Sequence, residues 1–272
     1  MQVSVIIPTY KDLQALQLIF EALETQTYKT FEVVIAEDDN SKEVAEYLSQ
    51  LKMPFPIKHI FQEDLGWRKA RAMNHAIKAS EGDYLIFFDG DCLPYSTFIE
   101  NHVKLSEENR VLCGRRVNLE DRVSSALRHR EITVREIETH YFRNYAKLKE
   151  DGARHIEQGL DLLSLIPKFL FELFNHNTRL VGCNFSVYKN KMVEINGFDE
   201  EYPTGDIADD VDIEWRLNAI GVKNKSCKYA ANLLHLNHFR SDRKLQHDKN
   251  FILMMEKQQQ QQIRCINGIE KL

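Results

Sequence analysis

The chain has 272 residues, of which 43% are hydrophobic and 28% are charged, an ordinary composition for a soluble globular protein. This length corresponds to one large domain or to a domain with an appendage. The net charge of −5 argues against a nucleic-acid binder, because such proteins carry an excess of basic residues. The five cysteines are scattered and never form a C-x-x-C pair, which argues against a disulfide framework or a zinc site.

No targeting or membrane-spanning segment is predicted. The chain starts directly in a strand pattern, without the charged region that opens a signal peptide. The most apolar later segment, residues 162–174, is shorter than the roughly 20 residues that a bilayer span needs. We therefore expect a cytoplasmic protein, with a peripheral contact at the inner face of a membrane left open, as is the oligomeric state.

The first part of the chain alternates strands and helices. Strands are predicted at residues 3–7, 31–36, 57–61 and 84–88. Helices are predicted between them, and the clearest has an apolar stripe formed by Leu13, Leu16, Phe20 and Leu23. This alternation predicts an α/β fold with a parallel sheet and right-handed crossovers.

Two of these strands run directly into carboxylates. Asp38 and Asp39 follow the second strand, and Asp89 and Asp91 follow the fourth. Because the carboxyl ends of parallel strands share one edge of a sheet, these acids are expected to line a single cleft. Two carboxylates on a tight turn can share a divalent cation that in turn holds a diphosphate. The alternative is that they only start a loop and a helix, and Pro94 is placed in the first turn of that helix.

The middle of the chain changes character. Residues 120–178 are charged and predicted to be mostly helical, as an inserted subdomain or lid. The apolar segment 162–174 is interpreted as the buried core of this insertion, with a membrane-surface face as the alternative. A strand pattern returns at residues 181–188.

A second group of acids lies between residues 206 and 212, at a predicted helix start. Carboxylates at this position are favoured by the helix dipole, so a solvated helix end is one interpretation and a general base is the other. A last strand is predicted at residues 229–236. His235 and His238 lie near its end, and the basic residues Arg240, Arg243 and Lys244 follow. A lone histidine is more often structural, but two of them before a basic run can complete a metal and diphosphate site.

Taken together, these segments resemble the family 2 glycosyltransferases, which have a GT-A fold. The resemblance covers about residues 2–113 and 181–240. Five stretches carry it: Val3-Ser4-Val5-Ile6-Ile7-Pro8-Thr9-Tyr10, Asp38-Asp39-Asn40-Ser41, Ala72-Met73-Asn74, Asp89-Gly90-Asp91, and Gly197-Phe198-Asp199-Glu200 with Asp209-Asp210-Val211-Asp212. The last stretch is also similar to the galactosyltransferase-like carboxyl-terminal half of chondroitin-polymerase-type enzymes.

The resemblance implies a domain organisation and a fold. A GT-A domain with a mostly parallel, Rossmann-like central sheet would occupy residues 1–240. Its parts would be a nucleotide-binding half at 1–113, a helical insertion at about 117–178, and an acceptor and catalytic half at 181–240. Residues 241–272 would form a helical tail.

The resemblance also implies roles for individual residues. The donor would be bound by a set of residues near the nucleoside, the diphosphate and the sugar: Pro8, Thr9, Tyr10, Asp39, Arg68 or Arg71, Asp89, Gly90, Asn184 and Arg240. Mn²⁺ or Mg²⁺ would be held by Asp91 with support from Asp89, and His235 or His238 would supply a further ligand. Asp210 would be the catalytic base, and Asp209 would help to hold the acceptor.

The implied reaction is an inverting transfer of a sugar from a UDP-sugar to a hydroxyl of an oligosaccharide or lipid-linked glycan acceptor. By resemblance, this reaction belongs to the synthesis of a bacterial surface polysaccharide or lipopolysaccharide. One alternative is a sugar-phosphate nucleotidyltransferase, but residues 8–15 contain no glycine for its phosphate loop. The other is an inactive carbohydrate- or nucleotide-binding relative, which would not need the acids at Asp39, Asp89, Asp91 and Asp210.

Overall fold

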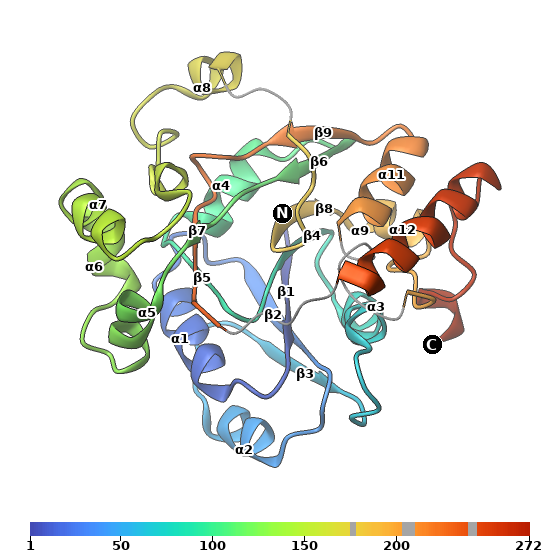
Figure 1. Cartoon of the computed structure of the whole chain (residues 1–272), viewed down its shortest axis with the longest axis horizontal. Coiled ribbons are helices and arrows are strands. Elements are labelled where there is room, and N and C mark those ends of the chain that lie inside the picture. The colour runs from blue at the N-terminus through green and yellow to red at the C-terminus, as the bar shows by residue number, and fades with distance from the viewer. Residues whose placement is uncertain (175–177, 203–209, 239–243) are drawn as a thin grey trace.

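The computed structural model describes residues 1–174, 178–202, 210–238 and 244–272. A seven-stranded sheet in the order β3-β2-β1-β4-β8-β6-β9 forms the centre of the molecule (Figure 1). Its strands are β1 (Val3–Thr9), β2 (Phe31–Glu37), β3 (Ile57–Phe61), β4 (Tyr84–Phe88), β6 (Arg110–Cys113), β8 (Asn184–Tyr188) and β9 (Lys223–Ser226). The strands predicted at 57–61 and 84–88 are confirmed residue for residue.

The sheet is mostly parallel. Strand β1 runs parallel to β2 and β4, β2 runs parallel to β3, and β6 runs parallel to β9. Only β8 is reversed, since it lies antiparallel to both β4 and β6. The carboxyl ends of β1, β2 and β4 therefore meet at one edge, which confirms the predicted α/β fold class.

Each face of the sheet is covered by helices. One face packs on α1 (Leu13–Glu24), α2 (Lys42–Gln50) and α4 (Phe98–Leu105), and the other on α3 (Lys69–Ala79), α9 (Lys189–Glu194) and α11 (Val211–Ala219). Strand β1 shows the alternation: Val5 and Ile7 belong to the first core and Ile6 to the second. All five cysteines are buried and none is in a disulfide.

Helix α1 forms where its apolar stripe was predicted. Asp12 caps its start by accepting a hydrogen bond of 2.9 Å from the amide of Ala15. Leu16, Phe20 and Leu23 are at most 1% exposed, and burying each such side chain stabilises the fold by about 1.5–3 kcal/mol. This apolar stripe therefore packs α1 against the sheet.

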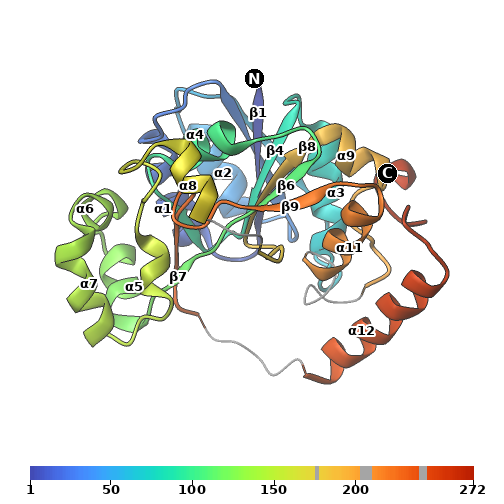
Figure 2. The ribbon, with the colours of Figure 1, turned by 90° about the horizontal axis from the view of Figure 1, so that it is seen from above.

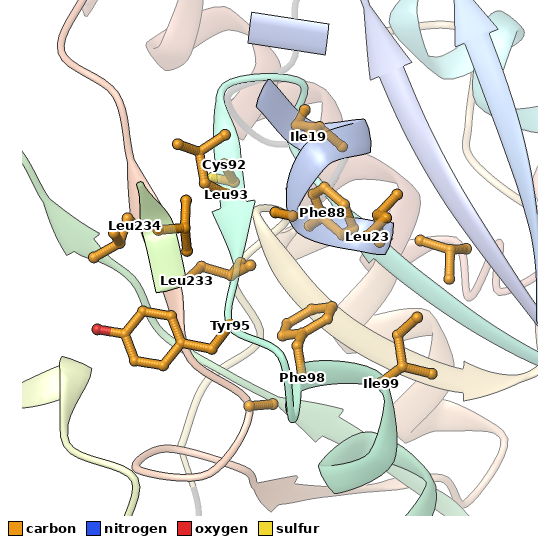
Figure 3. Packing of buried hydrophobic residues seen from close by; sticks show 14 of the residues in the cluster. Ile19, Leu23, Phe88, Cys92, Leu93, Tyr95, Phe98, Ile99, Leu233 and Leu234 are labelled. Atoms are coloured by element: carbon orange, nitrogen blue, oxygen red, sulfur yellow. The ribbon is translucent and has the colours of Figure 1, made fainter. Parts of the chain in front are cut away.

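The prediction that Pro94 opens a helix is wrong. Pro94 ends a strand, β5 (Cys92–Pro94), in a second sheet of order β5-β10-β7 with β10 (Leu233–His235) and β7 (Val117–Asn118). The reason is that Leu93 is wholly buried and pairs with Leu234 across the small sheet, beside Phe88 and Phe98 (Figure 3). This pairing sets Cys92 opposite His235, so the end of β10 lies close to the turn that follows β4.

Residues 121–174 are largely helical, as predicted. They form α5 (Asp121–Arg128), α6 (Val134–Thr139), α7 (Tyr141–Glu150), the short η1 (Ile156–Gly159) and α8 (Lys168–Phe174). Helices α5, α6 and α7 group together at one side of the sheet (Figures 1 and 2). The boundaries of the insertion stay a prediction.

The expectation that residues 162–174 are a buried core holds in part: Phe171 is 3% exposed, and Leu162, Leu163 and Ile166 are partly buried against the core. Leu165, Phe169 and Leu173, spaced four residues apart, are 63–66% exposed. Helix α8 is a single short helix at the periphery (Figure 1), so the side that carries Phe171 is buried while Phe169 and Leu173 face solvent. Among the described residues, none of the helices combines the length and apolarity that a membrane crossing requires.

The carboxyl-terminal segment begins with α12 (Lys244–Gln259) and ends, after the short η2 (Ile269–Lys271), at Leu272. Helix α12 stands out from the sheet (Figure 2), and it is fastened by Lys257, which pairs with Asp199 and Glu201 at 2.5 Å each. Met254 packs on Tyr202 and Trp215. The tail is therefore joined to the segment that leads into α11.

Candidate active site

The acids that follow β2 and β4 meet at one edge of the sheet, as predicted. A Cβ at Gly90 would lie 2.2 Å from the carbonyl oxygen of Pro8, so the turn between Asp89 and Asp91 passes directly beside the end of β1. The start of α3 joins the two acid groups: Asp38 accepts from the amide of Arg68 at 2.7 Å, and Asp89 accepts from the Lys69 ammonium at 2.7 Å. These contacts explain why both groups face the same region.

Asp91 lies between two histidines. Its Oδ2 is 3.3 Å from Nε2 of His235 and 3.1 Å from Nε2 of His238. Burial raises the pKa of Asp91, but the hydrogen bonds to His235 and then His238 outweigh it and hold that pKa well below its usual range. One donor atom from each of the three residues lies within 4.8 Å of the other two. A carboxylate with two imidazoles is a donor set that suits a divalent transition metal.

Asp89 is held by two cations that sequence reasoning missed. Lys69 contacts its Oδ1, and Arg116 contacts its Oδ2 at 3.2 Å. Arg116 follows β6 and was not among the basic residues singled out in the sequence. The only signal for it there is that it lies directly after another arginine, Arg115. Cys92 joins Asp89 and Asp91 in a second group of nearby donors, but burial raises the pKa of its thiol well above the ordinary value. Asp89 is thus paired with two cationic side chains, whereas Asp91 is paired with two imidazoles.

Asp39 is a buried carboxylate with a spare oxygen. It is 7% exposed, and its Oδ1 has no hydrogen-bond partner in the part of the chain that the structure describes. Burial, and next the nearby Glu37, raise the pKa of Asp39 above its ordinary value. A buried oxygen without a partner is costly unless a ligand supplies a donor. Asp39 is therefore a candidate for contact with a bound molecule.

The residues after β1 form one side of this region. Thr9, the last residue of β1, is buried, Pro8 is half-buried and Tyr10 is 51% exposed. The Tyr10 hydroxyl and the Lys11 ammonium both reach Asp64, and the ammonium lies 4.6 Å from the centre of the Tyr10 ring. These contacts hold the exposed Tyr10 ring near the segment after β2 that contains Asp39.

The two arginines proposed to face a nucleotide point to different neighbours. The Arg68 guanidinium donates to the carbonyl of Glu63, and its backbone amide donates to Asp38. Arg71 pairs with Glu200 at 3.3 Å, which connects α3 to the segment after α9. Arg68 is thus the one directly attached to the acids that follow β2.

Asn184 is fully buried at the start of β8. Its amide nitrogen donates to the carbonyls of Arg115 and Ala231 at 2.8 and 2.9 Å, and its oxygen lies 3.2 Å from Nε2 of His102. In this position it joins the large sheet to the chain that leads into β10. Its contact with a transferred sugar stays a prediction.

Asp210 caps the start of α11, where its side chain accepts from the amide of Val211 at 2.7 Å. Asp212, two residues on, is wholly buried and bonded to Arg216, Tyr202 and Trp215. Of these two acids, Asp210 is partly exposed and Asp212 is buried. Asp209 and Arg240 lie outside the described residues.

Comparison with known proteins agrees with this architecture. The family model for glycosyl transferase family 2 matches residues 4–160. A chondroitin synthase from Escherichia coli is 26% identical over 116 residues, which make up 42% of this chain and 17% of that protein. The chain accordingly spans less than a fifth of the length of curated relatives of this kind.

Two solved structures share the fold over most of the chain. A mannosyltransferase from Pyrobaculum calidifontis, in complex with GDP-Man and Mn²⁺, has a TM-score of 0.60 at 13% identity, covering 95% of this chain and 64% of that one. S. aureus TarS residues 1–349, in complex with UDP-GlcNAc, has a TM-score of 0.59 at 15% identity, covering 89% of this chain and 60% of that one. Both are glycosyltransferases with a GT-A fold. Since the family model matches more than half of the chain, the protein belongs to glycosyl transferase family 2.

Proposed function

We propose that this protein transfers a sugar, with inversion, from a metal-bound UDP-sugar to a hydroxyl of a glycan acceptor. The observation that carries the proposal is the meeting of Asp91 with His235 and His238, residues more than 140 positions apart, at the sheet edge where Asp39 has its spare oxygen. Related folds bind nucleotide sugars, as the complexes with GDP-Man and UDP-GlcNAc illustrate.

In this proposal Asp91, His235 and His238 hold the cation, and Asp89 supports them from its position between Lys69 and Arg116. Imidazole nitrogen favours Mn²⁺ over the harder Mg²⁺, so we propose Mn²⁺ as the preferred ion. When bound, the cation supplies Lewis-acid stabilisation of the charge that develops on the departing diphosphate. Lys69 and Arg116 add positive charge beside the same region.

The nucleoside is assigned to the ends of β1 and β2. Oδ1 of Asp39 would accept the N3–H of uracil, which would give this buried atom the partner that it lacks among the described residues. Pro8, Thr9 and Tyr10 would border the nucleoside, with the exposed Tyr10 ring as a stacking surface. Arg68 is the better placed of the two arginines to meet the nucleotide, because its backbone is bonded to Asp38.

The role of catalytic base is assigned to Asp210. Its carboxylate would take the proton from the acceptor hydroxyl while that oxygen attacks the anomeric carbon from the face opposite the diphosphate. The new glycosidic bond forms as the bond to the UDP oxygen breaks, so UDP leaves with the electron pair. Asp209 is proposed to hold the acceptor and Arg240 to meet the diphosphate. A bacterial surface glycan is proposed as the acceptor class.

A donor screen tests the proposal. UDP release from a panel of UDP-sugars, with GDP-mannose as a control, is measured with Mn²⁺, with Mg²⁺ and with EDTA. We expect release from one UDP-sugar, highest with Mn²⁺ and lost in EDTA. Release that is unaffected by EDTA, or GDP-mannose as the only donor used, would contradict the metal or the uridine assignment.

The same assay tests the base. General-base assistance contributes roughly 10²–10⁴ in rate, so Asp210→Asn should lose turnover by about that factor. UDP binding with Mn²⁺, measured by calorimetry, should persist in this variant. Glu46→Gln, an exposed acid on α2, serves as the matched control and should keep normal turnover. Near-normal turnover of Asp210→Asn would exclude it as the base.

A further inference from the structure

The segment that carries the two histidines is attached to helix α5, which belongs to the helical region rather than to the sheet. After β10, the amide of Asn237 donates to the Ser124 hydroxyl at 2.8 Å, and the Asn237 side-chain amide donates to Asp121 at 2.6 Å. Both partners lie on α5, and Ser124 is buried. Asn237 stands between His235 and His238, so these two hydrogen bonds act on the chain between two donors of the same group.

Apart from the contacts with α5, and within the part of the chain that the structure describes, the backbone at His235 is held by more hydrogen bonds than the backbone at His238. His235 is fixed by the small sheet, because its carbonyl accepts from Leu119 and the next amide, that of Leu236, donates to the carbonyl of Asp91, both at 2.9 Å. His238 lies beyond the end of β10 and its side chain is 41% exposed. Asn237 is therefore the point at which the structure fixes the backbone that leads to His238.

Helix α5 is itself firmly attached. The amide of Val123 donates to Asp151 at 3.1 Å, which ties the start of α5 to the end of α7. At the other end, Arg128 forms two hydrogen bonds of 2.9 and 2.7 Å with Asp12, the cap of α1. A helix that is anchored at both ends can set the position of a chain that is bonded to its middle.

We propose that Asp121 and Ser124 are positioning residues for the metal site, and that they act through Asn237 to place His238 against Asp91. The inference rests on the metal role proposed above for Asp91, His235 and His238. Residues that orient metal ligands through hydrogen bonds typically change metal affinity by about 10–100-fold when they are removed. Part of the affinity of the site thus depends on the helical region at residues 121–151.

Mn²⁺ binding to the whole chain, measured by calorimetry without nucleotide, tests this inference. Ser124→Ala and Asp121→Ala should each weaken Mn²⁺ binding by about tenfold or more. Ser125→Ala is the matched control, because among the described residues its hydroxyl contacts His129, the cap at the end of α5, and not Asn237, so its loss should leave Mn²⁺ affinity unchanged. Asp121→Asn should restore near-normal affinity, since its amide oxygen still accepts from Asn237. Restoration by the uncharged residue separates positioning from a simple effect of negative charge.

The melting temperature in EDTA shows whether the variants fold. Each lost hydrogen bond should lower it by no more than about 4 °C, whereas Mn²⁺ affinity should fall sharply. If the Ser124→Ala and Ser125→Ala proteins bind Mn²⁺ equally well, or if Asp121→Asn is as weak as Asp121→Ala, the inference is overturned. If the unmodified protein binds no Mn²⁺, the proposed function fails instead, so the two failures are distinguishable.

Discussion

The chain contains two Asp-x-Asp triplets that look alike in the sequence and are used in opposite ways. Asp89-Gly90-Asp91 follows strand β4, and Asp210-Val211-Asp212 starts helix α11. In the first triplet the last acid, Asp91, lies at the sheet edge against two histidines. In the second the last acid, Asp212, is wholly buried in the interior.

The element that carries each triplet explains the difference. At the end of a parallel strand the backbone stops at the edge where ligands bind, and Gly90 lets it turn beside Pro8 without a clash. In the second triplet, Asp212 lies within the first turn of α11, four residues before Arg216. Residues four apart lie on the same face of a helix, so their side chains can meet. Asp212 therefore meets Arg216 at 2.7 Å and becomes part of the core. The Asp-x-Asp pattern thus predicts a site only when its place in the fold is known.

The largest expected effect is on stability, at Asp212. Asp212→Asn would leave the buried Arg216 guanidinium without its counter-charge, which costs about 3–5 kcal/mol of unfolding free energy. Adding Arg216→Met should recover part of this loss, because no unpaired charge remains. Denaturant unfolding in EDTA measures both variants. An Asp212→Asn protein as stable as the unmodified one would break the contrast between the triplets.

Asp91→Asn should have the complementary effect. We expect Mn²⁺ affinity to fall by about 100-fold or more, because one ligand is lost directly rather than through a neighbour. Unfolding free energy in EDTA should fall less than it does for Asp212→Asn, since Asp91 lies at the sheet edge. Calorimetry with Mn²⁺ and UDP provides the measurement, and unchanged Mn²⁺ affinity would remove Asp91 from the site.

The middle residues of the two triplets give the smallest expected effects. Gly90→Ala forces a methyl group against the carbonyl of Pro8, and overpacking of this kind costs roughly 1–3 kcal/mol. Val211 is 37% exposed, so Val211→Ala should change stability by no more than about 0.5 kcal/mol. Thermal unfolding of the pair checks this. Equal effects would mean that the turn after β4 tolerates a side chain.

Local patterns were enough to predict β1 to β4 and helix α1, although not β5 or β6. Largely apolar runs mark β2 and β4, since strands buried on both faces read as nearly continuous apolar segments. The meeting of Asp38, Asp39, Asp89 and Asp91 followed from topology alone, because parallel strands share an edge. The proximity of His235 and His238 to Asp91 followed from the family resemblance, and the structure places both histidines there.

Other features depend on contacts between distant segments that no local pattern encodes. Pro94 was placed in a helix because the pairing of Leu93 with Leu234, about 140 residues away, is not visible in the sequence. Arg116 reaches Asp89 only because β6 lies next to β8 in the sheet. The apolar composition of residues 162–174 suggested a buried helix, although the short peripheral helix α8 leaves Phe169 and Leu173 exposed.

The central claim is that Asp91, His235 and His238 bind the cation that holds the sugar-nucleotide diphosphate. The most direct test is a crystal structure with Mn²⁺ and UDP, in which anomalous scattering locates the ion. We predict one strong anomalous peak within bonding distance of Asp91 and at least one of the two histidines, with UDP extending toward Asp39. A peak elsewhere, or UDP bound away from Asp39, would contradict the account.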